Sequence, residues 1–129
     1  MNEGKAIYTI LTTDSAVSAI VSSRVYPQIA AQGAVFPFVV YVMQGTDPSD
    51  TKSGVSILDE VRYDIVVASE TYAEASDLTN KIRTALDRYT GTVAGVVIDS
   101  IQFIDLDADN DPGTETFLTS TEYIIRVKR

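Results

Sequence analysis

An alternating pattern of apolar and charged residues at positions 55–68 constrains the fold more than any other feature of this chain. The apolar positions share one side of an extended segment, because successive side chains of a strand point to opposite faces: they are Ile57, Val61, Tyr63, Ile65 and Val67. The other side carries the charged residues Glu60, Arg62 and Asp64. The pattern predicts a strand with one face on a hydrophobic core and the other face in water or against another subunit.

A helix is predicted directly after this strand, over residues 71–89. Thr71 is followed three residues later by Glu74, which is the spacing of a capping box. The apolar positions of the segment form one stripe, made of Ala75, Leu78, Ile82, Ala85, Leu86 and Tyr89. We expect Leu78, Ile82 and Leu86 to pack on the sheet, and Gly91 to stop the helix.

The remaining segments are mostly strands and loops. Residues 4–21 have helical spacing that breaks at Asp14, which is a good N-cap for a second short helix from Ser15. Proline at position 27 favours an extended segment over residues 24–27. Irregular structure is expected over 28–36, and a long loop rich in turn residues over 44–54. Further strands are expected at 38–43, 96–106 and 117–128.

The elements therefore follow the order α–β–β–α–β–β. Strand pairs that alternate with helices predict the α+β class. We expect a four-stranded, mostly antiparallel sheet with the helices packed on one face. The length of 129 residues corresponds to a single domain, residues 1–129.

The chain contains no cysteine and no histidine. Their absence removes thiolate ligands, the usual general base near neutral pH and the commonest metal ligand. It also excludes nucleophilic systems built on Ser–His or Cys–His pairs. A glycine-rich phosphate loop is missing from the sequence as well. We therefore expect no catalytic residue, no metal site and no cofactor, and a protein that is not an enzyme.

The acidic sequence DLDADNDPGTE, residues 105–115, is the main candidate for a site. It could be a calcium loop, a carboxylate cluster of a metal-dependent enzyme, or a solvated loop between strands. A calcium loop of the EF-hand type needs glycine at its sixth position and glutamate at its twelfth. Counted from Asp105 these positions are Asn110 and Thr116, and counting from Asp107 fails as well. We expect a strand-connecting loop, and a small calcium-binding module is the alternative.

Charge is unevenly spread along the chain, whose net charge is −8. Residues 89–125 contain no Lys or Arg, and their acidic residues are Asp99, Asp105, Asp107, Asp109, Asp111, Glu115 and Glu122. Such a region repels nucleic-acid phosphates. The bases just before it, Lys81, Arg83 and Arg88, are expected on the solvated face of their helix.

No segment has the composition of a targeting signal or a membrane span. The N-terminus lacks a basic region followed by a sustained apolar run. The most apolar stretch, VFPFVVYVM at residues 35–43, is too short to cross a bilayer. We expect a soluble protein that is made in a cytoplasm and has no membrane partner.

Residues 17–45 carry a resemblance to a known family. A short apolar helix is followed by Arg24-Val25-Tyr26-Pro27, then by Gln32-Gly33-Ala34, then by Phe36-Pro37-Phe38-Val39-Val40-Tyr41. This order resembles the tail-completion proteins of long-tailed phages, which are also called tail-to-head joining proteins and are similar to siphophage tail terminators. The later strand, helix and closing hairpin agree in order, so the resemblance covers nearly the whole chain.

The resemblance implies a structural virion protein at the head-proximal end of the tail, assembled in the host cytoplasm. Members of the family assemble as rings, commonly hexamers, that stop growth of the tail tube and dock to the head connector. The implied partners are other copies of the chain, the tail tube protein and the head connector or stopper protein. DNA would pass through the lumen without specific binding, and the segment 105–115 would lie on the lumen or the head-facing rim.

Overall fold

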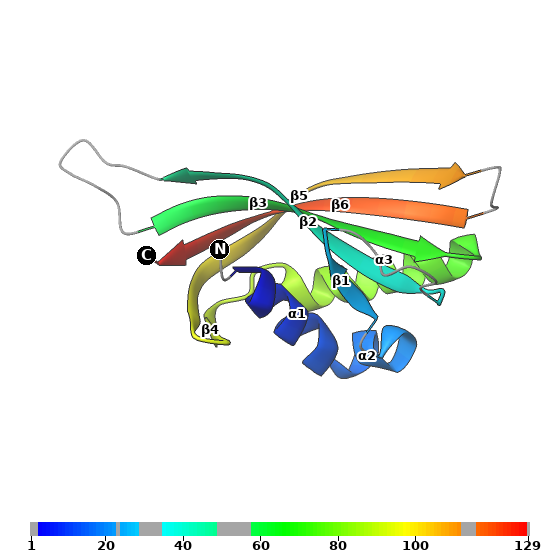
Figure 1. The fold of residues 1–129 in the computed structure, drawn as a ribbon, viewed down its shortest axis with the longest axis horizontal. Coiled ribbons are helices and arrows are strands. Elements are labelled where there is room, and N and C mark those ends of the chain that lie inside the picture. The colour runs from blue at the N-terminus through cyan, green and yellow to red at the C-terminus, as the bar shows by residue number, and fades with distance from the viewer. Residues whose placement is uncertain (1–2, 23, 29–34, 49–57, 112–115, 129) are drawn as a thin grey trace.

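The computed structural model describes residues 3–22, 24–28, 35–48, 58–111 and 116–128, which form helices and one sheet (Figure 1). The helices are α1 (Glu3–Thr13), α2 (Ser15–Val21) and α3 (Tyr72–Leu86). The strands are β1 (Val25–Pro27), β2 (Phe38–Pro48), β3 (Leu58–Ser69), β4 (Gly91–Val93), β5 (Val96–Asp111) and β6 (Thr116–Lys128).

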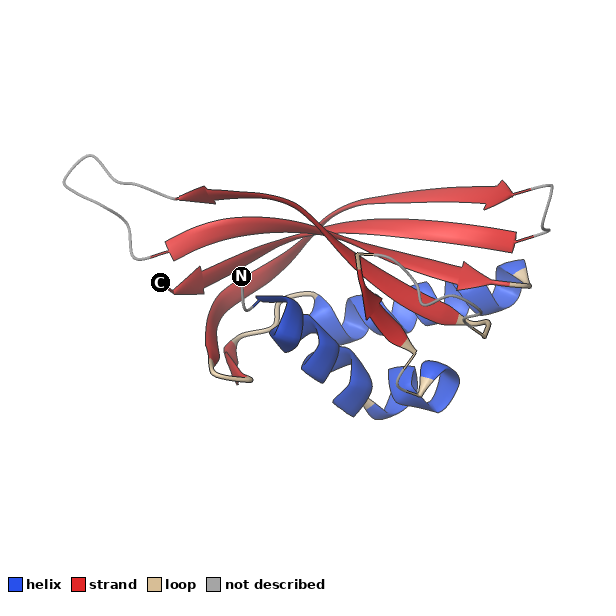
Figure 2. Ribbon diagram, viewed as in Figure 1, coloured by secondary structure: helices blue, strands red, loops and turns tan. Residues whose placement is uncertain are grey.

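The strands form a six-stranded sheet in the order β1-β2-β3-β6-β5-β4. β1 pairs with β2 in parallel, and the other pairs are antiparallel. The four long strands run the length of the molecule, while β1 and β4 are short additions at its two edges (Figure 2). The prediction of a four-stranded sheet is therefore wrong, although the α+β class broadly fits. β1 and β4 have three residues each, and so short a segment has no detectable hydrophobic period.

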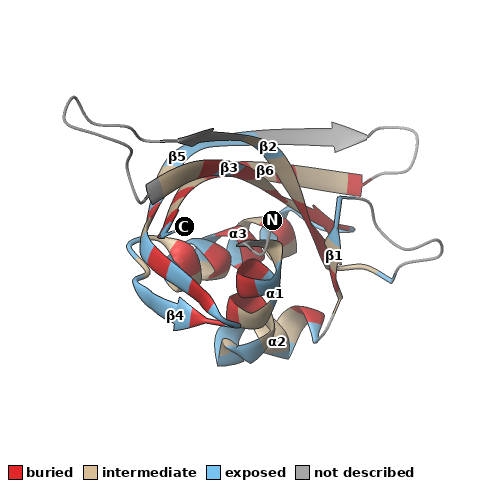
Figure 3. Cartoon of the chain, turned by 60° about the vertical axis from the view of Figure 1, so that its left-hand side comes forward, coloured by how far each residue is buried: buried red, intermediate tan, exposed pale blue. Residues whose placement is uncertain are grey.

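The sheet curls over the helices, and the hydrophobic core lies between these two layers (Figure 3). Both layers contribute the largest fully buried side chains: Tyr123, Ile7, Leu11, Ile65, Leu78, Ile82, Leu86, Ile101, Ile125, Val17, Val21 and Val39. The buried stripe of α3 includes Leu78, Ile82 and Leu86, as predicted. Among the described residues, no helix covers the outer face of the sheet.

The first two helices separate at Asp14, as predicted. One carboxylate oxygen of Asp14 accepts hydrogen bonds from the N–H groups of Ala16 (3.0 Å) and Val17 (3.1 Å). These donors have no partner within the helix, so the cap stabilises its start. The extended segment predicted over 24–27 is present and forms β1. Most of the irregular segment predicted over 28–36 lies outside the described residues.

Helix α3 begins as predicted, but its capping box runs through a third residue. The Thr71 hydroxyl oxygen accepts the N–H of Glu74 (3.2 Å). The Glu74 carboxylate accepts the hydroxyl of Ser69 (2.7 Å), and the Ser69 oxygen accepts the N–H of Thr71 (3.2 Å). Ser69 is the last residue of β3 and is fully buried. Its hydroxyl therefore connects the helix start to the sheet.

Helix α3 ends earlier than predicted, at Leu86, with Asp87 as its cap. Arg88 takes the left-handed conformation (φ 64°) that a glycine usually supplies at a helix end. Its N–H donates to the carbonyl of Ile101 on β5 (2.7 Å). This contact holds the turn, so the expectation that Gly91 stops the helix is wrong.

Within the described residues, no helix combines the length and the apolar character that crossing a membrane requires.

Strand β3 confirms the two faces predicted from the alternating pattern. Its apolar face is buried, at Val61, Tyr63, Ile65 and Val67. The side chains of the opposite face are half-buried or exposed, at Glu60, Arg62 and Asp64. Ile57 lies outside the described residues.

Strand β2 extends into the segment predicted as a loop over residues 44–54. It continues through Pro48, which lies opposite Asp59 of β3, with a shift of register between Met43 and Gly45. Turn-type residues dominate this sequence, yet pairing with β3 keeps them in the sheet. The rest of the predicted loop, residues 49–54, lies outside the described residues.

Candidate functional site

The acidic sequence belongs mainly to a strand and not to a loop. β5 continues through Asp111, and its last residues pair with β6, from Asp105 opposite Glu122 to Asp111 opposite Thr116. The expectation of a strand-connecting loop over 105–115 is therefore wrong for residues 105–111, and 112–115 lie outside the described residues. Aspartates at every second position have the period of a strand, and this signal was present in the sequence.

Two β-bulges in β5 decide which side chains face outward. The register shifts between Ile98 and Ser100, and again between Phe103 and Asp105. With regular pairing, odd-numbered residues would share one face, and Asp105 would lie beside Ile101 and Phe103. The extra residue at position 104 reverses the alternation. Ile101 and Phe103 therefore pack on the core, while Asp105 and Asp107 belong to the outer face.

The carboxylates of three neighbouring strands meet on this outer face. Asp64 of β3 lies opposite Glu122 of β6, which lies opposite Asp105 of β5. A shallow depression of about 190 Å³ is lined by Asp64, Asp105, Asp107, Ser120 and Glu122. Burial raises the pKa of the Asp64 carboxyl, and the hydrogen bond from the Gln44 amide (2.9 Å) lowers it by less.

This acidic depression does not have the geometry of a calcium loop. The EF-hand arrangement wraps successive residues of one loop around the ion, whereas here the carboxylates project from three paired strands. Among the described residues, no three Asp, Glu, His or Cys side chains are placed to hold a metal ion together. The absence of a tight metal site at residues 105–115 stays a prediction, because part of this segment lies outside the described residues.

The edge of the sheet at β5 is covered along only part of its length. β4 pairs with residues 96–98. The N–H of Arg88 then donates to Ile101 O (2.7 Å), and the Asp87 carboxylate accepts the N–H of Phe103 (3.2 Å). Beyond Phe103, β5 has no second neighbouring strand in the described part of the chain. Such an open edge presents unpaired backbone groups that can bind another chain.

An open groove beside the covered part of this edge contains three arginines. We call it the arginine groove, with a volume of about 670 Å³ and a lining of Arg83, Asp87, Arg88, Thr90, Asp99, Ser100, Ile101, Gln102, Phe103 and Arg126. The Arg83 guanidinium lies 3.9 Å from the centre of the Phe103 ring, a cation–π contact. The Arg126 guanidinium donates to the Gln102 side-chain oxygen (3.2 Å).

The sequence indicated this groove only in part. Arg83 and Arg88 are exposed, as predicted, but Arg88 lies beyond the end of α3. Lys81 pairs with Asp77 on α3 (3.0 Å) and does not line the groove. Arg126 and Gln102 were not singled out, because only the pairing of β5 with β6 brings them beside the end of α3.

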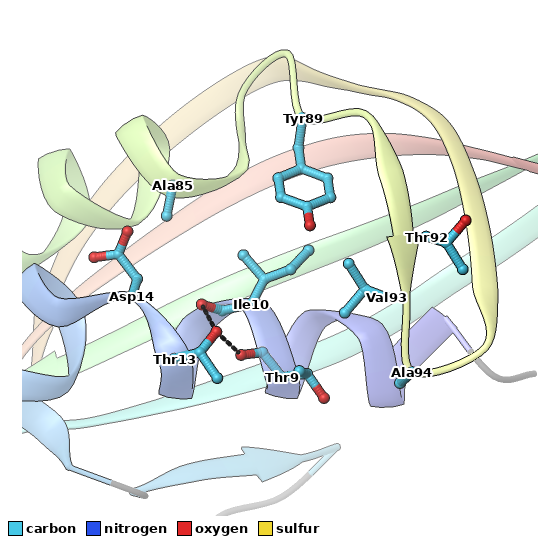
Figure 4. A pocket seen from close by; sticks show the side chains of 9 residues that line it. All are labelled: Thr9, Ile10, Thr13, Asp14, Ala85, Tyr89, Thr92, Val93 and Ala94. Carbon is cyan, nitrogen blue, oxygen red and sulfur yellow. Dashed lines mark hydrogen bonds between the residues drawn. The ribbon is translucent and has the colours of Figure 1, made fainter.

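A second cleft lies between α1, the end of α3 and β4, and has a volume of about 450 Å³ (Figure 4). Two of its polar side chains have local partners: the Thr13 hydroxyl donates to the carbonyl oxygen of Thr9 (2.6 Å), and the Asp14 carboxylate caps α2. The remaining lining residues are Ile10, Ala85, Tyr89, Thr92, Val93 and Ala94. The cleft has no base and nucleophile pair of the kind that group-transfer chemistry needs.

Comparisons with known proteins agree with the family resemblance of the sequence. The family described as Tail completion protein gp17 matches this chain over residues 5–128. Among solved structures, a chain from the "Virion of native gene transfer agent (GTA) particle" is similar, with a TM-score of 0.75 and 16% sequence identity over 98% of this chain and 94% of that chain. At this identity the similarity shows a shared fold. No curated protein sequence matches the chain. The chain belongs to the tail completion protein gp17 family and is a structural protein of the virion tail.

Proposed function

We propose that this protein forms a ring, expected to be a hexamer, that closes the head-proximal end of the tail tube and joins the tail to the head connector. Its partners in this role are other copies of the chain, the tail tube protein and the connector or stopper protein. Residues 1–129 act in this proposal as a single domain, with DNA passing through the lumen of the ring.

The observation that carries the proposal is the match to the tail completion family over residues 5–128. The architecture supports it: the outer face of a long curled sheet and the β5 edge beyond Phe103 lack a partner in the described residues. Open edges and uncovered faces of this kind suit a subunit whose neighbours complete it. The chain would then reach its full set of contacts only in an assembly.

The charge of the chain supports passage of DNA without binding. The net charge is −8, and like charge on a protein surface repels phosphates at close range. At physiological ionic strength the repulsion decays over about 8 Å, so it acts only on DNA that passes close to the wall. A purified ring should therefore show no measurable affinity for linear duplex DNA at that ionic strength.

The proposed role is structural and needs no catalysis. With no His or Cys in the chain, we expect no hydrolytic or transfer activity of its own. Magnesium- or manganese-dependent cleavage of DNA by the purified protein would contradict this. The alternative of a calcium-binding module would be favoured by a calorimetric titration that gives one tightly bound calcium ion per chain.

Deleting the gene for this chain, in the genome that encodes the particle, tests the function directly. We expect filled heads and separate tails in electron micrographs of the lysate, and a fall of several orders of magnitude in infectious or gene-transferring particles. Purified wild-type protein added to the lysate should restore joining. Normal yields of complete particles without the chain would contradict the proposal.

A further inference from the structure

We propose that the acidic strand, the part of β5 around Asp105 and Asp107, binds in the arginine groove of the next copy of the chain. This inference rests on the proposed ring, because it names the contact that joins neighbouring subunits. It is carried by two surfaces of opposite charge that lie on different parts of the same molecule.

The arginine groove can recognise carboxylates. Arg88 is exposed and has no ion pair within the described residues, and its backbone is fixed by the hydrogen bond to β5. The other two guanidiniums are positioned by Phe103 and Gln102. Their ion pairs with Asp87 and Glu60 both measure 3.8 Å, longer than the roughly 2.7–2.9 Å of a charged hydrogen bond. A better-placed carboxylate could therefore compete for these donors.

The acidic strand has the matching properties. Asp105 and Asp107 are exposed on the outer face. Ile104 is exposed as well, at 39%, and it lies at the bulge next to Asp105, so the strand offers apolar contact beside its charges. Its backbone is also the part of β5 that has no second neighbour in the described residues.

The two surfaces face different regions of the molecule. The acidic strand leads to one end of the sheet, where β5 meets β6 (Figure 1). The arginine groove is lined by residues from the end of α3, the first half of β5 and the last part of β6, and these segments lie toward the other end of the sheet (Figure 1). A contact between unlike surfaces is heterologous, and its repetition generates a closed ring or an open filament, not a two-fold dimer. This matches the symmetry that a ring requires.

A second copy fits the groove better than DNA does. Asp87 and Asp99 also line the groove, and the chain as a whole has a net charge of −8. Both features disfavour a long polyanion. A short strand that brings two carboxylates and one apolar side chain can place its charges on the arginines alone.

Cross-linking between cysteines tests the contact in wild-type-like subunits. The chain has no native cysteine. The double variant Thr90→Cys/Ser120→Cys places one thiol in the groove and one on β6 opposite Asp107, and it keeps the charged residues of both surfaces. A short bismaleimide should convert it, as purified protein at high concentration or in particles, into a ladder of dimers, trimers and larger species. The control is Lys81→Cys/Ser120→Cys, because Lys81 lies outside the groove, and it should give no ladder.

Charge exchange provides a second test. Arg88→Glu places an acid in the groove, and Asp107→Lys places a base on the acidic strand. Each variant alone should need at least about tenfold more protein to assemble, while an equal mixture should assemble at the wild-type concentration, because each copy then meets an opposite charge. Lys81→Glu is the matched control and should behave as wild type.

Absence of a ladder both in solution and in particles would overturn the proposed contact and would favour placing the acidic strand on the lumen or the rim. Assembly of both single variants at the wild-type concentration would overturn it too. So would a mixture of the two variants that assembles no better than either variant alone. Tighter DNA binding by wild type than by Arg88→Glu would indicate a nucleic-acid groove instead. A ladder, combined with failure of purified wild-type protein to restore tail joining in the deletion lysate, would support this contact and would contradict the proposed function.

Discussion

At the scale of single residues, the core has an unusual polar member. Tyr123 is 1% exposed, and among the described residues its hydroxyl is buried without a hydrogen-bond partner. Burial raises the pKa of this phenol, the Asp87 carboxylate raises it further, and the Arg83 guanidinium opposes them. The ring packs edge-on against Phe103, which lines the arginine groove together with Asp87 and Arg83.

Replacing this tyrosine tests whether the hydroxyl is unpaired. A buried polar group without a partner costs about 1–3 kcal/mol. Tyr123→Phe should therefore leave the free energy of unfolding unchanged or increase it by up to about 1 kcal/mol, as measured by denaturant titration. A clear loss of stability would show that the hydroxyl has a partner.

Leu86 tests the helix face that the sequence predicted. Its side chain is 1% exposed on the buried stripe of α3. Leu86→Ala should reduce the free energy of unfolding by about 2–5 kcal/mol, because it removes buried methyl groups and leaves a cavity. Thr84→Ala, at an exposed position of the same turn, should change it by less than about 0.5 kcal/mol. Equal effects of the two variants would contradict the assigned face.

Asp64 gives a prediction about pH. Its pKa is raised in the folded protein, so folding favours the protonated form. That contribution is present below the unfolded pKa and is lost as the pH rises through the folded pKa. Asp64→Asn should therefore gain stability relative to wild type as the pH rises above about 4, the usual pKa of an unfolded Asp, in denaturant titrations at a series of pH values. A difference that stays constant, or that falls with rising pH, would contradict the burial argument.

At the scale of elements, the bulge at Ile104 explains how the acidic strand reaches the outer face. Because position 104 is the extra residue between Phe103 and Asp105, deleting Ile104 should restore regular pairing and keep the aspartates outward. Deleting Leu106 instead should turn an aspartate toward the buried Thr121, which lies opposite position 106. Thermal unfolding should show a clearly lower Tm for the second deletion. A larger loss from deleting Ile104 would contradict the assigned register.

The sequence predicted elements whose local signals agree with their environment. Asp14, Thr71 and the alternation in β3 act through local geometry, so the broken helix, the start of α3 and the two faces of β3 were predicted correctly. β2 and β5 were predicted too short, because Gly, Asp and Pro were interpreted as turn residues. Pairing with β3 and β6 overrides these local preferences, and such pairing depends on residues far away in the chain.

At the scale of the whole molecule, the sequence predicted the candidate site only through its composition and not through its arrangement in space. The uneven charge was visible in the sequence, but its meaning changed when the acidic residues proved to lie in a strand. The arginine groove joins side chains from α3, β5, β6 and the turn after α3, so no single segment could reveal it. The family resemblance, in contrast, rested on a local order of residues and was confirmed over residues 5–128.

The central claim is that this protein joins tail to head as a ring of like subunits. Cryo-electron microscopy of the head–tail junction, in particles that encode this chain, tests it most directly. The account predicts a closed ring of this fold between the last layer of the tail tube and the head connector, with neighbouring copies in head-to-tail contact. Finding the chain elsewhere in the particle, or as isolated copies at the junction, would contradict the account.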